Sequence, residues 1–100
     1  MIKFAICDNN QKMLDSISNK LHAYYPDECE IKTYTDGTSL LLTCFRSCFD
    51  ALFLNIDMPG SNGMEIAGKI CEIDWRVKII FVSKKNGLLT KAIYTMPLDL

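Results

Sequence analysis

Oxygen-bearing side chains follow three apolar segments of this sequence, and their types and positions make them the first candidates for chemistry. Asp8 and Asn9 follow "IKFAIC", Asn55 and Asp57 lie at the end of "ALFLNID", and Ser83 ends "VKIIFVS". Carboxylate, carboxamide and hydroxyl oxygens suit a hard cation such as Mg²⁺. We therefore expect a Mg²⁺ site wherever the fold brings the ends of these three segments into one crevice.

The elements that must position these side chains are four short apolar runs bounded by polar residues. Each run is only a few residues long and is flanked by residues that break regular structure, which indicates strands. The third run is apolar on both faces, as in parallel sheets that helices cover on both sides. The predicted strands are Ile2–Cys7, Cys29–Tyr34, Asp50–Ile56 and Val77–Ser83.

Between the strands, apolar residues recur at the spacing of amphipathic helices. Asn9 or Asn10 can cap the first helix, Pro26 lies just past its end, and Asn62 can cap the third helix. We expect four helices, with apolar faces formed by Met13, Leu14, Ile17, Leu21 and Tyr24; by Leu40, Leu41, Cys44, Phe45 and Cys48; by Met64, Ala67, Ile70, Cys71 and Ile73; and by Leu88, Leu89, Ala92 and Ile93 before Pro97.

This regular alternation of strands and helices predicts an α/β fold with a parallel sheet and right-handed crossovers. In such sheets, ligands bind beyond the carboxyl ends of the strands. The oxygen-bearing side chains described above lie at the ends of the first, third and fourth predicted strands, so we expect them to share one site.

Composition excludes several classes of protein. The chain has 100 residues, enough for one domain over 1–100, and 49% are hydrophobic, which argues against disorder. The net charge is −1 with scattered Lys and Arg, so we expect this domain itself to bind no nucleic acid. No apolar run is long enough to span a membrane, and the N-terminus lacks the layout of a signal peptide. We therefore expect a cytoplasmic protein that does not contact membranes.

The five cysteines, with no export signal, are expected to be reduced thiols. Cys44 and Cys48 lie one helical turn apart, but a zinc site needs further ligands, and His22 is the single histidine. Small apolar roles for the thiols are favoured.

Three stretches give the chain its resemblance to a known family: "ICDNN", "FLNIDMPGSNGMEIAGKI" and "IIFVS". Together they resemble a response-regulator receiver domain of two-component signalling, most of all the receivers in front of LytTR-type DNA-binding domains. The resemblance implies a flavodoxin-like (CheY-like) parallel sheet of order 2-1-3-4-5 and a place in phosphorelay signal transduction and transcription regulation. It also implies that the last strand and helix of the fold are missing here.

The resemblance assigns a role to each candidate residue. Asp8 and Asn9 stand where two acidic residues hold Mg²⁺, and the backbone carbonyl of Asp57 would add a further ligand. Asn55 occupies the position of the aspartate that accepts a phosphoryl group from a histidine kinase. Ser83 occupies the position that binds this phosphoryl group. The lysine that the family places at the end of the fifth strand has no counterpart.

Asn55 and Asn9 depart from the family pattern in ways that matter chemically. A carboxylate can attack phosphorus, whereas a carboxamide is a neutral and very poor nucleophile. Of three expected carboxylates only Asp8 is left, so Mg²⁺ binding should be weak. We expect a degenerate receiver, or pseudo-receiver, which is not an enzyme and acts through contacts with a histidine kinase or another signalling protein.

Other interpretations of the same residues stay open. Asp57 could be the acceptor, or Asn55 could be an ordinary strand-end side chain bonded to nearby backbone. Asp8 and Ser83 could each simply cap a helix. Lys84 and Lys85 could reach the crevice or be solvated.

Two other functions are also compatible with the pattern. The chain could be a small flavodoxin-like enzyme or phosphate-ligand binding domain, although "CDNNQK" stands where a glycine-rich phosphate loop would be. It could also be a structural or dimerisation remnant of a larger regulator.

The fourth predicted strand, Val77–Ser83, raises the question of its outer edge. Its apolar residues have the pattern of an interior strand, and an exposed apolar edge invites pairing with another chain. We expect either self-association through this strand, or coverage of the edge by the fourth helix and the Met96–Leu100 tail.

Overall fold

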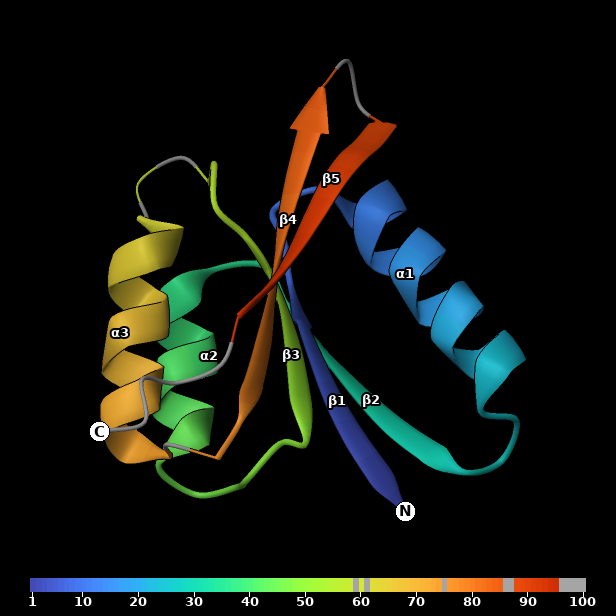
Figure 1. The fold of residues 1–100 in the computed structure, drawn as a ribbon, viewed down its shortest axis with the longest axis horizontal. Coiled ribbons are helices and arrows are strands. Elements are labelled where there is room, and N and C mark those ends of the chain that lie inside the picture. The colour runs from blue at the N-terminus through green and yellow to red at the C-terminus, as the bar shows by residue number, and fades with distance from the viewer. Residues whose placement is uncertain (59, 61, 75, 86–87, 96–100) are drawn as a thin grey trace.

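The computed structural model describes residues 1–58, 60, 62–74, 76–85 and 88–95, and from residue 83 onward it does so through the backbone. The described residues form a five-stranded sheet of order β2-β1-β3-β4-β5 and three helices (Figure 1). Along the chain the elements are β1 (Ile2–Cys7), α1 (Gln11–Tyr24), β2 (Cys29–Tyr34), α2 (Gly37–Cys44), β3 (Ala51–Asn55), α3 (Gly63–Ile73), β4 (Lys78–Lys85) and β5 (Leu88–Thr95).

The first four strands are parallel, as the sequence predicted. β1 pairs with β2 on one side and with β3 on the other, and β3 pairs with β4. Because the strands run in one direction, their carboxyl ends meet at the same edge of the sheet. The predicted flavodoxin-like order 2-1-3-4 is confirmed for these strands.

Helices cover both faces of the sheet, with α1 on one side and α2 and α3 on the other (Figure 1). Each face has its own apolar core, and the side chains of Ala5, Leu52 and Leu54 are fully buried. The core under α2 and α3 contains Ala5, Cys7, Leu40, Cys44, Phe49, Leu52, Leu54, Met58, Ala67, Ile70, Val77, Ile79 and Phe81. The core under α1 contains Phe4, Ile6, Met13, Leu14, Ile17, Leu21 and Val82.

A polar side chain caps the start of each helix. Asn10 accepts a hydrogen bond from the Met13 N–H, and Asn62 accepts from the N–H groups of Met64 and Glu65. Such caps satisfy backbone donors that have no partner inside the helix. Of the two candidates for the first helix, Asn9 and Asn10, the cap is Asn10. Asn62 is confirmed as the cap of α3, and Asp36 caps α2 in the same way.

The prediction of a fourth helix is wrong. It was expected around Leu88, Leu89, Ala92 and Ile93. These residues belong to β5, which pairs antiparallel with β4. Two features of the sequence favour a hairpin. Asn-Gly, at positions 86 and 87, is the dipeptide that most favours a two-residue hairpin turn. The segment that follows contains threonine, isoleucine and tyrosine, which have high strand propensity.

β5 also changes the expectation for the sheet edge. The outer side of β4, at Val77–Ser83, was expected to be open to another chain or covered by a helix and the tail. Instead it pairs with β5 from Ile79 opposite Thr95 to Lys85 opposite Leu88. The fold therefore contains a fifth strand, although it is antiparallel. The Met96–Leu100 tail lies outside the described residues.

Smaller differences concern the ends of elements and the exposure of some residues. α2 ends at Cys44, so Phe45 and Cys48, expected on its apolar face, lie beyond it and are exposed. Tyr24 and Met64 lie on helices but are also exposed. Within the part of the chain that the structure describes, no helix has the length and apolar character needed to cross a membrane.

Candidate functional site at the carboxyl ends of the strands

Asp8 lies directly after β1, and its carboxylate is held inside the protein. Only 1% of the residue is exposed. Its backbone N–H donates to the Tyr34 carbonyl at 3.0 Å, and its Oδ1 accepts from the Asn10 N–H at 2.9 Å. The first bond ties the end of β1 to the end of β2, and the second ties the carboxylate to the cap of α1. Asp8 therefore has a fixed position at the sheet edge.

Asn55 is the last residue of β3 and is buried to the same extent, with 1% exposed. Its Oδ1 accepts a hydrogen bond from the Asp57 N–H at 3.0 Å. The next residue, Ile56, donates its N–H to the Val82 carbonyl at 3.3 Å, which fastens the strand end to β4. The carboxamide thus orders the first turn of the loop after β3.

The register of the sheet brings Asp8 and Asn55 to the same level. Cys7 of β1 pairs with Leu54 of β3. The next residues, Asp8 and Asn55, therefore lie side by side at the ends of two adjacent strands. Neighbouring strands are about 4.8 Å apart, which places the two side chains at one small site. Among the residues whose burial the structure describes, Asp8 and Asn55 are the two buried polar residues.

The other predicted site residues are placed differently. Asn9 and Asp57 are exposed, Asn9 just after Asp8 and Asp57 in the turn after β3. Ser83 lies within β4, where its backbone pairs with Lys91; its side chain and those of Lys84 and Lys85 lie outside the described part. The structure therefore brings Asp8 and Asn55 together and leaves the expected role of the Ser83 hydroxyl as a prediction.

Two sulfur-containing side chains contact each other in the core under α2 and α3, and one of them, Cys7, directly precedes Asp8. The Cys7 Sγ lies 3.9 Å from the Met58 Sδ, and both residues are buried. Burial, together with the negative charges of Asp36 and Asp8, raises the pKa of the Cys7 thiol to about 12. The thiol is therefore neutral at physiological pH and serves as packing.

Gly63 is a site residue that the sequence analysis missed. A Cβ at this position would lie 2.6 Å from the Ile56 Cα and 2.9 Å from the Asn55 carbonyl oxygen. The start of α3 therefore packs directly against the backbone that carries Asn55. The Asn-Gly pair at the start of the third predicted helix was the available signal, because glycine there permits close approach of two backbones.

The donor set does not match a strong Mg²⁺ site. Asp8 supplies the one carboxylate buried here, and the Asn55 oxygen already accepts the Asp57 N–H. Among the residues that the structure describes, no group of three or more His, Cys, Asp or Glu side chains is arranged to hold a metal ion. Mg²⁺ prefers carboxylates within an octahedron of oxygens. The arrangement is therefore poor in the charge that such an ion needs.

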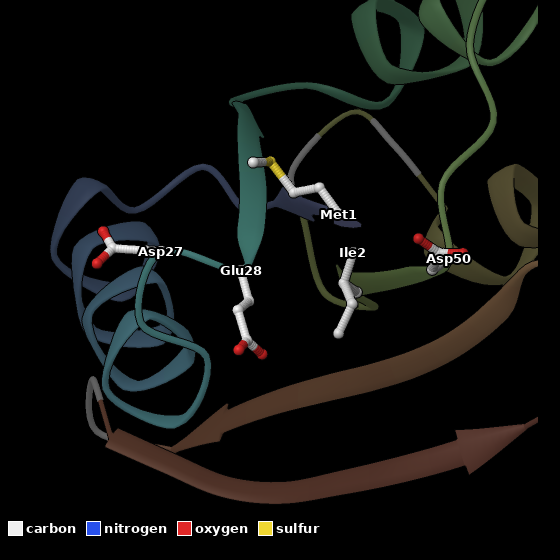
Figure 2. Close-up of a pocket in the computed structure, with 5 residues that line it drawn as sticks. All are labelled: Met1, Ile2, Asp27, Glu28 and Asp50. Atoms are coloured by element: carbon white, nitrogen blue, oxygen red, sulfur yellow. The ribbon is translucent and has the colours of Figure 1, made fainter.

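A cavity lies at the opposite edge of the sheet. It has a volume of about 780 Å³ and is lined by Met1, Ile2, Asp27, Glu28 and Asp50 (Figure 2). These residues belong to the beginnings of β1, β2 and β3 or to the segments just before them. The cavity is therefore separate from the site of Asp8 and Asn55.

Comparison with known proteins agrees with this architecture. A protein of Debaryomyces hansenii, stress response regulator protein 1, is 34% identical over 93 residues, which cover 91% of this chain. The chain spans only 38% of the length of that relative.

Among solved structures, response regulator protein TrrA from Thermotoga maritima in complex with Mg²⁺-BeF is 27% identical, with a TM-score of 0.75. The match covers 86% of this chain and 72% of that one. A structure of the histidine kinase ThkA in complex with TrrA also matches, at 28% identity and a TM-score of 0.72, over 83% of this chain and 69% of that one.

The family described as the response regulator receiver domain matches residues 4–96, which is nearly the whole chain. The parallel sheet order and the polar residues at the carboxyl ends of β1 and β3 agree with that match. The chain belongs to the response regulator receiver domain family.

Proposed function

We propose that this chain is a degenerate receiver that accepts no phosphoryl group at position 55 and acts in signal transduction through protein–protein contacts. One observation carries the proposal: the buried side chain at the end of the central strand β3 is the carboxamide of Asn55. It sits at the position that the receiver motif gives to the phosphoacceptor, beside the carboxylate of Asp8.

The chemistry of the side chain explains why transfer should fail. Acceptance of a phosphoryl group requires an oxygen that attacks phosphorus and carries the new bond. The carboxamide nitrogen lone pair is delocalised into the carbonyl, and the oxygen of Asn55 already accepts the Asp57 N–H at 3.0 Å. The residue therefore keeps the shape of the loop while lacking a nucleophile. We propose no enzymatic activity for the chain.

Asp57 is the other carboxylate that could accept a phosphoryl group. It is exposed in the turn after β3, whereas Asn55 is buried at the strand end. Its backbone N–H, bonded to Asn55, fixes the turn rather than activating its carboxylate. We therefore keep position 55 as the acceptor position in this proposal.

Metal binding should be weak for the same reason. Asp8 and the backbone carbonyl of Asp57 are the groups that would hold Mg²⁺, and when bound the ion would neutralise charge on an anionic ligand. One carboxylate with neutral donors is expected to bind Mg²⁺ only at millimolar concentrations or above. Asn9→Asp should strengthen binding, because it restores a carboxylate next to Asp8. Calorimetric titration of both proteins with MgCl₂ measures the difference, and tight binding by the unmodified chain would contradict the proposal.

The partner of such a module is a protein. The resemblance to TrrA, a receiver solved with the histidine kinase ThkA, supports a histidine kinase or another signalling protein as the partner. A cytoplasmic location and an affiliation with LytTR-type transcription regulators belong to the same proposal. The gene sequence downstream of Leu100 tests the affiliation directly.

Acetyl phosphate with Mg²⁺ tests the chemistry. We expect the intact mass of the protein to stay unchanged, because the Asn55 carboxamide is not a nucleophile and the Asp57 carboxylate is exposed in the turn, away from the buried strand end. Asn55→Asp should gain little phosphate by itself, since Asn9 leaves the metal site short of charge. The double variant Asn9→Asp/Asn55→Asp should gain more, because it restores both the nucleophile and the metal ligand.

Peptide mapping of any adduct gives the control. A phosphoryl group on Asp57 of the unmodified chain would show that position 55 is not the acceptor position. Rapid, stoichiometric phosphorylation of Asn55→Asp alone would show that Asn9 does not limit the site.

A further inference from the structure

An exposed apolar patch lies where α2 ends. Leu42 and Phe45 are 62% and 68% exposed. They are three residues apart, and Phe45 keeps helical backbone angles, with φ −71° and ψ −18°. The two side chains therefore share one side of the helix end. Large apolar side chains held next to each other in water favour contact with another surface, because their burial releases water.

A groove beside this patch gives the surface a concave shape. Its volume is about 520 Å³, and it is lined by Lys32, Leu42, Thr43, Phe45, Arg46 and Ser47. The backbone N–H groups of Arg46 and Ser47 both donate to the Thr43 carbonyl at 2.9 Å, so the turn after α2 has a fixed shape. A surface that is already ordered loses little entropy on binding. We call it the α2 groove.

The charged side chains that line the α2 groove are both cationic. Lys32 lies on the same side of β2 as Tyr34, which packs against the core under α2 and α3. Arg46 follows α2, one helical turn after Leu42. In the part of the chain that the structure describes, neither cation forms an ion pair with a carboxylate. Glu30 lies on the same side of β2 but does not line the groove. The groove is thus locally positive on a chain whose net charge is −1.

We propose that the α2 groove binds an acidic segment of a partner protein that carries an apolar side chain among its carboxylates. The apolar side chain enters the groove against Leu42 and Phe45, and the carboxylates pair with Lys32 and Arg46. This inference rests on the proposed action through protein–protein contacts, and it names a surface for one such contact. The groove lies apart from the carboxyl ends of the strands, where Asp8 and Asn55 are found.

The shape and charge of the α2 groove favour a polypeptide over other anionic partners. A membrane surface is broad, so it would touch the exposed side chains and leave a concave groove unfilled. A nucleic acid needs cations along a row of phosphates. Here two cations flank a lining that is otherwise apolar or bears hydroxyl groups. A peptide supplies both an apolar side chain for the groove and carboxylates for its rim.

Fluorescence anisotropy with a labelled peptide tests the binding. The probe is a helical peptide of about fourteen residues, with glutamate on one face and leucine and phenylalanine on the other. The control peptide has lysine in place of every glutamate. We expect the whole chain to bind the acidic peptide at least about tenfold more tightly at low salt, because Lys32 and Arg46 attract carboxylates. The net charge of −1 would by itself favour the lysine peptide. Equal binding of the two peptides, or no binding, would overturn the proposal.

Two charge-reversal variants locate the binding site. Lys32→Glu/Arg46→Glu should weaken binding of the acidic peptide about tenfold or more. Lys12→Glu/Lys20→Glu makes the same change in net charge with exposed residues of α1, which covers the other face of the sheet (Figure 1). This control should weaken binding by about twofold at most, because distant charges are screened. Equal losses in the two variants would show that net charge governs binding and would overturn the assignment to the α2 groove.

Leu42→Ser/Phe45→Ser tests the apolar part of the α2 groove. It should weaken binding of the acidic peptide about fivefold or more, because less apolar surface is buried in the complex. The urea midpoint should stay the same, since both side chains are exposed. An unchanged affinity would overturn the proposal.

Phosphatidylglycerol-containing vesicles and a labelled oligothymidylate test the other anionic partners. We expect the chain to bind both more weakly than it binds the acidic peptide. Tighter binding of either one, lost in Lys32→Glu/Arg46→Glu, would overturn the proposal in favour of a membrane or a nucleic acid. None of these outcomes bears on whether Asn55 accepts a phosphoryl group, so the test with acetyl phosphate remains independent.

Discussion

At the scale of single residues, Asn55 shows how one side chain can preserve the structure of a site and remove its chemistry. It is buried, lies level with Asp8, and accepts the Asp57 N–H at 3.0 Å. An aspartate in this place could accept the same hydrogen bond, so the turn does not depend on the carboxamide. The loss is confined to the nucleophile and to one negative charge.

Gly63 allows a test of whether close packing of α3 against the end of β3 stabilises the site around Asn55. Gly63→Ala would place a Cβ 2.6 Å from the Ile56 Cα and 2.9 Å from the Asn55 carbonyl oxygen, both of which are backbone atoms. Because backbone cannot rotate away as a side chain can, either α3 or the loop after β3 must shift. We expect a loss of about 1–3 kcal/mol in the free energy of unfolding, the usual cost of overpacking. Urea unfolding measures it.

Gly68 is the matched control on the same helix. A Cβ there meets nothing within 4 Å. Gly68→Ala should therefore stabilise the protein by about 0.5–1 kcal/mol, because alanine has the better helix propensity. If both alanine variants proved equally stable, the close packing of Gly63 against β3 would be refuted.

At the scale of elements, each helix begins at a side chain that replaces a missing backbone partner. Asp36 does this for α2: its Oδ1 accepts the Ser39 N–H at 2.8 Å and its Oδ2 accepts the Ser39 hydroxyl at 2.9 Å. These bonds, the backbone one first, lower the pKa of Asp36 below its ordinary value of 3.8. Charge on this carboxylate is thus coupled to the start of the helix.

That coupling predicts a dependence of stability on pH. A carboxyl whose pKa is lower in the folded state stabilises the fold above its ordinary pKa of 3.8, and this contribution is lost as pH falls through the lowered value. Asp36→Asn keeps an oxygen that can cap α2 but cannot titrate. The advantage of the unmodified chain over Asp36→Asn in urea midpoint should be constant near neutral pH and shrink below about pH 4. A difference that grew on acidification would contradict this assignment.

At the scale of the whole molecule, the fold depends on keeping β4 inside the sheet. Ile79 and Val82 are almost fully buried, on opposite faces, in the two cores. One side of β4 pairs with β3 and the other with β5. An apolar strand of this kind, if it lost β5, would present an edge that pairs readily with another chain.

Proline substitutions in β5 test this role. Ala92 pairs with Val82 and Ile93 with Phe81. Successive N–H groups of a strand point to opposite edges, so Ala92→Pro/Ile93→Pro must remove one donor that faces β4. We expect the unmodified chain to be monomeric and this variant to associate as its concentration rises, as measured by light scattering coupled to gel filtration.

The control for this test is Ala92→Val/Ile93→Val, which keeps strand propensity and every backbone donor. It should behave as the unmodified chain does, and hydrogen exchange of the Ile79–Val82 amides should stay slow. A proline variant that stayed monomeric with these amides equally protected would show that β5 does not shield β4.

The sequence by itself determined the elements whose signals are local. Short apolar runs predicted β1 to β4. Asn62 was predicted as a cap, and the cap of α1 was narrowed to Asn9 or Asn10, because a cap acts on the few residues that follow it. The order of the parallel strands and the position of Asn55 at the end of β3 followed from the receiver resemblance and the alternation of elements. These features depend on neighbours along the chain or on a known pattern, so they could be predicted without coordinates.

Only the tertiary structure decided the features that depend on partners distant in sequence. The Leu88–Thr95 segment was expected to contain a helix, but its apolar residues fit both helix and strand spacing, and pairing with β4 made it a strand. The contact of Gly63 with the backbone of Asn55 and Ile56 depends on how α3 packs against the sheet. Packing energy and backbone pairing across the sheet, which no local pattern encodes, fixed these positions.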